Sequence, residues 1–195
     1  MSALGSEMNH ALGAMRRKHY ERLDELGVQR SDLMLGMVGI ARIRRRGGLY
    51  EPHPLGAVFL ITPVRMAESV EHAAPASVVR VGDIVDLIAW LPGRARTYQR
   101  TGGAEWLGAI GPQYLEPEPV PIWRTPLAWF KAKCEGLVLF GDKAARYRTL
   151  TEIRSIQAED AVHAAELQEA LLPPWPLPKI RYPRFVPHGT GVRAA

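Results

Sequence analysis

The chain has 195 residues, of which 47% are hydrophobic, and its formal net charge is +5. This length and apolar content predict one domain with a buried core, and the single cysteine, Cys134, excludes a disulfide framework within the chain. Neither a secretory signal pattern nor a run of about 18 apolar residues is present. The composition therefore predicts a cytoplasmic protein that makes no membrane contact.

The positive charge is concentrated at the two ends of the sequence. Residues 1–46 hold nine lysines and arginines against five acids, and residues 173–195 hold four against none. Residues 47–172 instead carry twelve basic residues against fifteen acids. Basic arms around a mildly acidic body are typical of proteins that pair their cations with phosphates. A solvated basic surface is the alternative interpretation.

The N-terminal segment, residues 1–35, is predicted to be helical. Apolar side chains over residues 7–26 fall on one stripe, which predicts a single helix with Ser6 as its N-cap and Gly27 at its end. A short second helix is expected to begin at Ser31-Asp32.

A basic hairpin is predicted next. Residues 37–46 and Leu49-Tyr50 have strand patterns, and Gly47-Gly48 closes the turn between them. The densest basic cluster of the chain surrounds this turn and consists of Arg42, Arg44, Arg45 and Arg46. Contact with nucleic-acid phosphates and simple solvation of a hairpin tip both fit such a cluster.

Three apolar runs are predicted to form the centre of a mixed β-sheet. They are residues 57–61, which are expected to end at Pro63, residues 78–90 and residues 137–140. Because β-branched residues dominate the second run, we expect it to be buried on both faces. The residues expected to be buried in one sheet or one continuous core are Ile61, Leu87 and Val138.

Shorter elements are predicted between the second and third apolar runs. Residues 98–100 are expected to return as a strand, and residues 104–110 to form a short helix. Residues 112–126 are rich in proline, which lacks an N–H group, so they are predicted to cross the fold as an extended segment without ladder hydrogen bonds.

Capping residues mark the helices of the C-terminal third. Thr125-Pro126 begins one helix, which Gly136 ends, and Asp142 caps another helical turn. Residues 152–156 are predicted to form a strand, and residues 158–172 an amphipathic helix. The side chains expected to face inward from that helix are Val162, Ala165, Leu167 and Leu171.

Residues 173–195 form a proline-rich tail that is predicted to lie outside the α+β core of residues 36–172. Its aromatic residues are expected to dock on the body of the protein, a second copy or a partner: Trp175, Tyr182 and Phe185. Its arginines extend the candidate nucleic-acid contacts to Arg181 and Arg184. The whole chain is thus predicted to be a single α+β domain with a mixed sheet, an N-terminal helix, packed helices and an extended tail.

The sequence contains no motif whose spacing enforces a catalytic chemistry. The six histidines lack zinc-ligand spacing, and Gly102-Gly103 is not part of a P-loop or a dinucleotide fingerprint. Asp83 and Asp86 are paired acids in the central run, and Asp86 is interpreted as a buried, hydrogen-bonded structural acid. We therefore predict no catalytic residue, no metal and no cofactor.

Short motifs between residues 27 and 172 resemble a group of known proteins. The motifs are Gly39-Ile40-Ala41-Arg42-Ile43, Leu49-Tyr50-Glu51-Pro52, Thr62-Pro63-Val64, Val85-Asp86-Leu87-Ile88-Ala89, Arg100-Thr101-Gly102, Leu107-Gly108 and Thr125-Pro126-Leu127. In these the chain resembles uncharacterised proteins of bacterial prophage and mobile-element regions. The resemblance implies a phage-related setting and no activity.

Three functions are open at this point. The first is a non-enzymatic accessory protein that contacts DNA, RNA or a nucleoprotein partner through the arginine hairpin and the basic ends. The second is an enzyme that processes nucleic acid in a cleft formed by Asp83, Asp86, Arg100 and Glu105. The third is a virion or assembly component held by its tail. Carboxylates that converge within reach of a metal would favour the enzyme, whereas an arginine strip without an acidic pocket would favour the binding protein.

Overall fold

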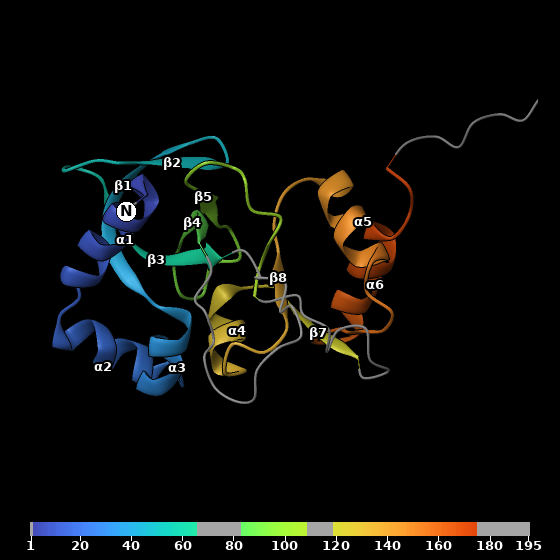
Figure 1. Cartoon of the computed structure of the whole chain (residues 1–195). Coiled ribbons are helices and arrows are strands. Elements are labelled where there is room, and N and C mark those ends of the chain that lie inside the picture. Colours follow the sequence, from blue (N-terminus) through green and yellow to red (C-terminus); the bar gives the residue numbers. More distant parts are fainter. Residues whose placement is uncertain (1, 66–82, 109–118, 175–195) are drawn as a thin grey trace, which may run out of the picture.

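Two β-sheets organise the chain, a closed five-stranded barrel and a smaller four-stranded sheet. This computed structural model describes residues 2–65, 83–108 and 119–174 (Figure 1). The barrel and the first three helices lie on one side of the molecule, and the second sheet with the last two helices lies on the other (Figure 1). The predicted α+β fold with a mixed sheet is confirmed.

The barrel contains the predicted hairpin, the first apolar run and the described part of the second run. Its strands are β1 Gly39–Arg46, β2 Leu49–Pro52, β3 Ala57–Arg65, β4 Ile84–Trp90 and β5 Tyr98–Gln99, in the order β1-β2-β5-β4-β3. β1 and β2 pair antiparallel, with Arg46 opposite Leu49, across a turn in which Gly47 has a positive φ of 64°. The barrel closes where β2 and β5 pair in parallel. The hairpin prediction is therefore confirmed.

β3 continues through Pro63 to Arg65, so the prediction that this strand ends at Pro63 is wrong. β1 pairs with β3 only as far as Ile61, and beyond that point β4 is the strand beside it among the described residues. One side of this stretch needs no ladder hydrogen bonds, so a residue without an N–H is tolerated there.

The second sheet holds the third apolar run at its centre. Its strands are β6 Trp106–Leu107, β7 Val120–Trp123, β8 Leu137–Leu139 and β9 Ile156–Gln157, in the order β6-β8-β7-β9. β8 pairs antiparallel with β6 and parallel with β7. β7 also pairs in parallel with β9. The prediction of a strand over residues 152–156 is wrong except at Ile156, because the strand covers Ile156 and Gln157 alone.

Two other predictions for this sheet are wrong. Over residues 104–110, a helix was expected where the structure has the strand β6, which is held by pairing with β8. The expectation of no ladder hydrogen bonds over residues 112–126 fails at β7, where the Val120 N–H donates to the Ser155 carbonyl at 2.8 Å. Because prolines alternate with Val120 and Ile122, the N–H groups of these two residues remain available for pairing.

One hydrophobic core crosses from the barrel to the second sheet. Ile61 and Leu87 are each 0% exposed and Val138 is 1% exposed, which confirms their predicted burial. Val138 belongs to the second sheet, yet it packs in the same cluster as Trp90 of β4, whose ring stacks on Phe130 at 5.7 Å between centroids. The expectation of a continuous core is confirmed, although the three runs do not share one sheet.

The N-terminal segment forms two helices, α1 Ala3–Gly13 and α2 Arg17–Glu25, so the prediction of one helix over residues 7–26 is wrong. Ser2, and not Ser6, caps α1 by accepting a hydrogen bond from the Gly5 N–H at 3.1 Å. Arg16 is extended between the two helices, and its N–H donates to the His19 ring at 2.9 Å.

The break between the helices allows each of them to pack on a different part of the core. Met8 of α1 joins the cluster inside the barrel, whereas Leu23 of α2 joins the cluster that reaches the second sheet. The short helix expected next is α3 Arg30–Gly36, but its N-cap is Gln29 and not the predicted Ser31-Asp32.

Two C-terminal helices begin at their predicted caps. Thr125 accepts from the Ala128 N–H at the start of α4 Pro126–Lys131, and Asp142 accepts from the Ala145 N–H at the start of α5 Lys143–Thr151. The chain then continues into α6 Ala161–Ala170. None of the helices in the described residues is both long and apolar enough to cross a membrane.

α6 is shorter than predicted, and its buried face is different. Val162 and Leu171 are 67% and 37% exposed, so the expectation that they point inward is wrong, and Ala165 is exposed as well. Asp160 sets the start of the helix by capping the His163 N–H at 2.7 Å. His163 and Leu167, four residues apart, consequently form the buried face.

Candidate nucleic-acid interface

The carboxylate of Asp86 is buried in the fold and surrounded by backbone donors. Its oxygens accept hydrogen bonds of 2.8–3.3 Å from five N–H groups, those of Leu87, Arg100, Thr101, Gly103 and Ala104. With 0% exposure, Asp86 offers no free oxygen to a metal or a substrate. The predicted burial and hydrogen bonding of Asp86 are confirmed, and the loop at Gly102-Gly103 closes around this side chain.

The other residues of the hypothetical enzyme cleft are paired elsewhere or stand apart. Arg100 binds Glu7 at 2.9 Å, Glu105 binds Arg148 at 2.5 Å, and Asp83 is exposed before β4. The described residues contain no group of three or more His, Cys, Asp or Glu side chains that could hold a metal ion. Burial raises the pKa of the Cys134 thiol to about 12, so this cysteine is not a thiolate nucleophile at neutral pH.

A network of three side chains fastens α1 to the barrel. The buried Tyr50 hydroxyl donates to Glu7 at 3.0 Å, and Arg100 donates to the second oxygen of the same carboxylate. Burial and then the Glu7 charge raise the pKa of Tyr50 above its ordinary value, so the phenol keeps the proton that it donates. No sequence signal links Glu7 with Arg100, which lies far along the chain.

The hairpin displays its arginines to solvent. Arg42, Arg44, Arg45 and Arg46 are all exposed. Because Ile43 is buried in the barrel and side chains alternate along a strand, the outer face carries Arg42, Arg44 and Arg46 at intervals of about 7 Å.

The fold uses little of the hydrogen-bonding capacity on this outer face. Arg42 donates to the Gly56 carbonyl at 3.0 Å, and Arg46 lies 3.5 Å from Glu51 in an ion pair whose side chains are 84% and 53% exposed. The Arg44 guanidinium has no hydrogen bond or ion pair with the part of the chain that the structure describes.

A fifth arginine joins the hairpin from the loop between β4 and β5. Arg96 and Arg45 both lie over the ring of Tyr98, at 5.2 and 5.8 Å from its centroid. Arg96 also reaches the Gly47 carbonyl in the hairpin turn at 3.4 Å. We call Arg42, Arg44, Arg45, Arg46 and Arg96 the arginine surface. Sequence reasoning missed Arg96, because only the parallel pairing of β2 with β5 brings its loop to the hairpin.

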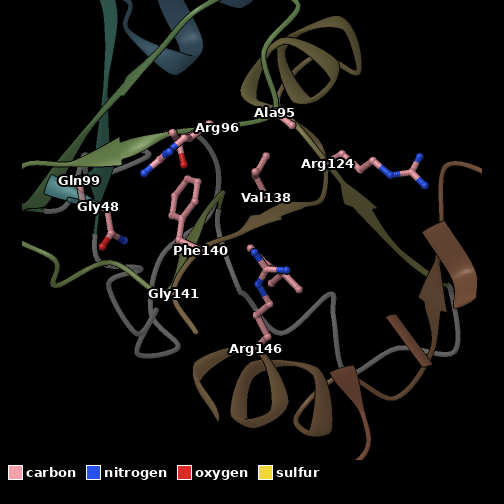
Figure 2. Close-up of a pocket in the computed structure, with 11 residues that line it drawn as sticks. Gly48, Ala95, Arg96, Gln99, Arg124, Val138, Phe140, Gly141 and Arg146 are labelled. Atoms are coloured by element: carbon pink, nitrogen blue, oxygen red, sulfur yellow. The ribbon is translucent and has the colours of Figure 1, made fainter. Parts of the chain in front are cut away.

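Beside the arginine surface, a cleft of about 350 Å³ separates the barrel from the second sheet (Figure 2). Gly48 and Arg96 line its barrel side, and Val138 and Phe140 line the opposite side. In Figure 2, Arg146 projects from α5 toward Val138. Sequence reasoning gave Arg146 no role, since nothing in its helix distinguishes it from its neighbours.

Arg124 also borders the cleft, but Figure 2 shows its guanidinium pointing away from Arg96 and Arg146. It binds three carboxylates at 2.6–3.4 Å, those of Glu159, Asp160 and Glu166. Its hydrogen bonds hold the pKa of Asp160 well below the ordinary value. Arg124 is therefore a structural cation that ties β7 to the start of α6.

The tail residues predicted to bind partners or nucleic acid lie outside the described residues. They are Trp175, Arg181, Tyr182, Arg184 and Phe185, and their roles stay predictions. The first part of the central run, residues 78–82, lies outside the description as well.

None of the protein-family models, curated proteins and solved structures compared with this chain matches it.

Proposed function

We propose that this chain is a non-enzymatic nucleic-acid-binding protein that contacts phosphates through the arginine surface. The observation that carries the proposal is that the hairpin arginines are exposed while the fold leaves most of their donors unused. The resemblance of residues 27–172 to prophage and mobile-element proteins supports an accessory role in that setting.

The chemistry of the side chains supports phosphate as the ligand. Each guanidinium carries five N–H donors in a planar fork that matches the oxygens of a phosphate. Within the described residues, the Arg42 guanidinium donates only to the Gly56 backbone carbonyl and the Arg46 guanidinium pairs only with Glu51. Glu51 is the one acid in β1 and β2 against four arginines. A ligand with several phosphates would balance the charge of this hairpin.

The spacing supports contact with a nucleic-acid backbone and not with base edges. A strand presents alternate side chains in a straight row, and the row here is Arg42, Arg44 and Arg46. A straight row of cations follows a chain of phosphates, whereas base readout requires an element that enters a groove. We therefore expect binding that depends weakly on sequence.

The test compares two variants that remove the same charge from different places. Arg42, Arg44 and Arg46 are replaced together by Gln, and the control replaces the exposed Arg22, Lys143 and Arg154 by Gln. Fluorescence anisotropy then measures the affinity of each full-length protein for labelled single-stranded and duplex DNA and RNA of arbitrary sequence at low salt.

We expect the hairpin variant to lose at least about tenfold in affinity and the control to lose less than about threefold, because local phosphate contacts outweigh net charge. Equal losses in the two variants would place the binding site away from the hairpin. Absence of binding by the unmodified protein at low salt would overturn the proposed function.

A further inference from the structure

The cleft beside the hairpin turn has a cationic lining without an internal counterion. Arg96 and Arg146 project from different elements, the loop after β4 and the helix α5, and no acid is present among the described lining residues. The third lining cation, Arg124, is already neutralised by its three carboxylates. The unbalanced charge of the cleft is therefore that of Arg96 and Arg146.

Of the two arginines in α5, one has an acidic partner among the described residues and the other, Arg146, has none. Arg148, two residues further along α5, is paired with Glu105 at 2.5 Å. Arg146 is exposed, and its side chain has no hydrogen bond or ion pair within the described ranges. An anion from outside the protein could form with Arg146 the kind of ion pair that Glu105 forms with Arg148.

The shape of the cleft restricts the kind of anion. Its volume of about 350 Å³ is at the small end of the range for ligand sites, roughly 300–1,000 Å³. On the side of the second sheet, Val138 and Phe140 are 1% and 4% exposed, so the half-buried Leu139 is the apolar side chain that a ligand in the cleft would meet. Gly48 both borders the cleft and lies in the turn of the arginine hairpin, which makes the two sites continuous.

We propose that this cleft receives one nucleotide of a single-stranded nucleic acid, with its phosphate at Arg146 and its sugar or base toward Leu139. The proposal rests on the proposed function and adds the class of nucleic acid. A duplex keeps its bases stacked inside and its phosphates on a convex surface, so it cannot place a nucleotide in this cleft. A flexible single strand that lies along the hairpin can do so.

The decisive variant is Arg146→Gln, because the fold does not use this side chain. Its matched control is Arg154→Gln, which removes one exposed arginine that does not line the cleft. Thermal melting of both proteins verifies that they fold as the unmodified chain does. Affinities are measured for a twelve-nucleotide oligo-dT, a twelve-nucleotide oligo-rU and a duplex of equal length, with thymidine monophosphate and inorganic phosphate as competitors.

We expect Arg146→Gln to weaken binding of the single strands about tenfold and binding of the duplex less than about twofold, with no change in the Arg154→Gln control. Equal weakening for single strand and duplex would overturn the preference for single strands while leaving phosphate binding by the hairpin intact. If Arg146→Gln bound single strands with unchanged affinity, the cleft would not be part of the binding site. Thymidine monophosphate or inorganic phosphate could compete with the oligonucleotide at a concentration equal to that of its nucleotides. Such competition would assign the cleft to a free ligand and overturn the strand proposal.

Discussion

Asp86 and the arginines of the β1–β2 hairpin are all charged residues of the barrel, but the fold uses them differently. The Asp86 carboxylate is 0% exposed and accepts five backbone hydrogen bonds. On the hairpin, Arg44 is exposed and has no side-chain partner in the described structure. The comparison shows that the role of a charged residue follows from how much of its hydrogen bonding is satisfied internally. Asp86 organises the fold, whereas the hairpin is available to an external ligand.

Among the variants considered, replacing Asp86 by Asn is expected to lower the stability of the fold the most. Asn keeps the shape but turns one acceptor oxygen into an NH₂ group that faces backbone N–H donors. We expect the free energy of unfolding to fall by about 3 kcal/mol, measured by chemical denaturation. A loss below about 1 kcal/mol would show that the five hydrogen bonds do not depend on the carboxylate.

A smaller loss of stability is expected for Arg100→Gln. Arg100 and Glu7 form an ion pair whose side chains are 32% and 18% exposed, so the contact is partly screened by solvent. We expect a loss of about 1–2 kcal/mol, because Glu7 retains the hydrogen bond from Tyr50. Denaturation of Arg44→Gln provides the contrast, with a change within about 0.5 kcal/mol. Similar losses of unfolding free energy in Arg100→Gln and Arg44→Gln would contradict the claim that the fold uses Arg100 but not Arg44.

Local signals explain the parts of the fold that were predictable from the sequence. The hairpin follows from Gly47-Gly48 between two strand patterns, and the starts of α4 and α5 follow from Thr125 and Asp142. The buried state of Asp86 was also predictable, since it lies within an apolar run.

The errors arise where tertiary contacts decide the outcome. β6 and β9 have two residues each, which is too short for a periodic pattern, so pairing with β8 and β7 defines them. The inward face of α6 depends on where Asp160 starts the helix. At the candidate site, the four hairpin arginines were identifiable from sequence. The position of Arg96 depends on the pairing of β2 with β5, and that of Arg146 on how the barrel meets the second sheet.

His163 is a buried residue whose ordinary pKa lies close to neutral pH. It is 4% exposed, and its ring accepts a hydrogen bond from the Glu159 N–H at 3.3 Å. Burial, and then the charge of Arg124, lowers the pKa of His163 below its ordinary value. The unfolded chain therefore binds a proton more readily than the folded protein does.

The contribution of His163 to stability is consequently complete above about pH 7 and declines as the pH falls through the ordinary histidine pKa of about 6.5 toward the lower folded value. Thermal melting between pH 7 and pH 5 should show a shallower loss of stability for His163→Asn than for the unmodified protein. The control, His10→Asn, changes an exposed histidine of α1 and should keep the original slope. An unchanged slope in His163→Asn would exclude His163 as a source of the pH dependence.

The salt dependence of nucleic-acid affinity tests most directly whether the arginine surface binds phosphates. Each phosphate contact contributes about 0.9 to the slope of log affinity against log salt for duplex DNA. The variant with Gln at positions 42, 44 and 46 should therefore bind duplex DNA with a slope lower by about two to three than the unmodified protein. Arg45 is kept in this variant because it contacts Tyr98. The Arg22, Lys143 and Arg154 control should retain the full slope, and an unchanged slope in the hairpin variant would contradict phosphate binding by the arginine surface.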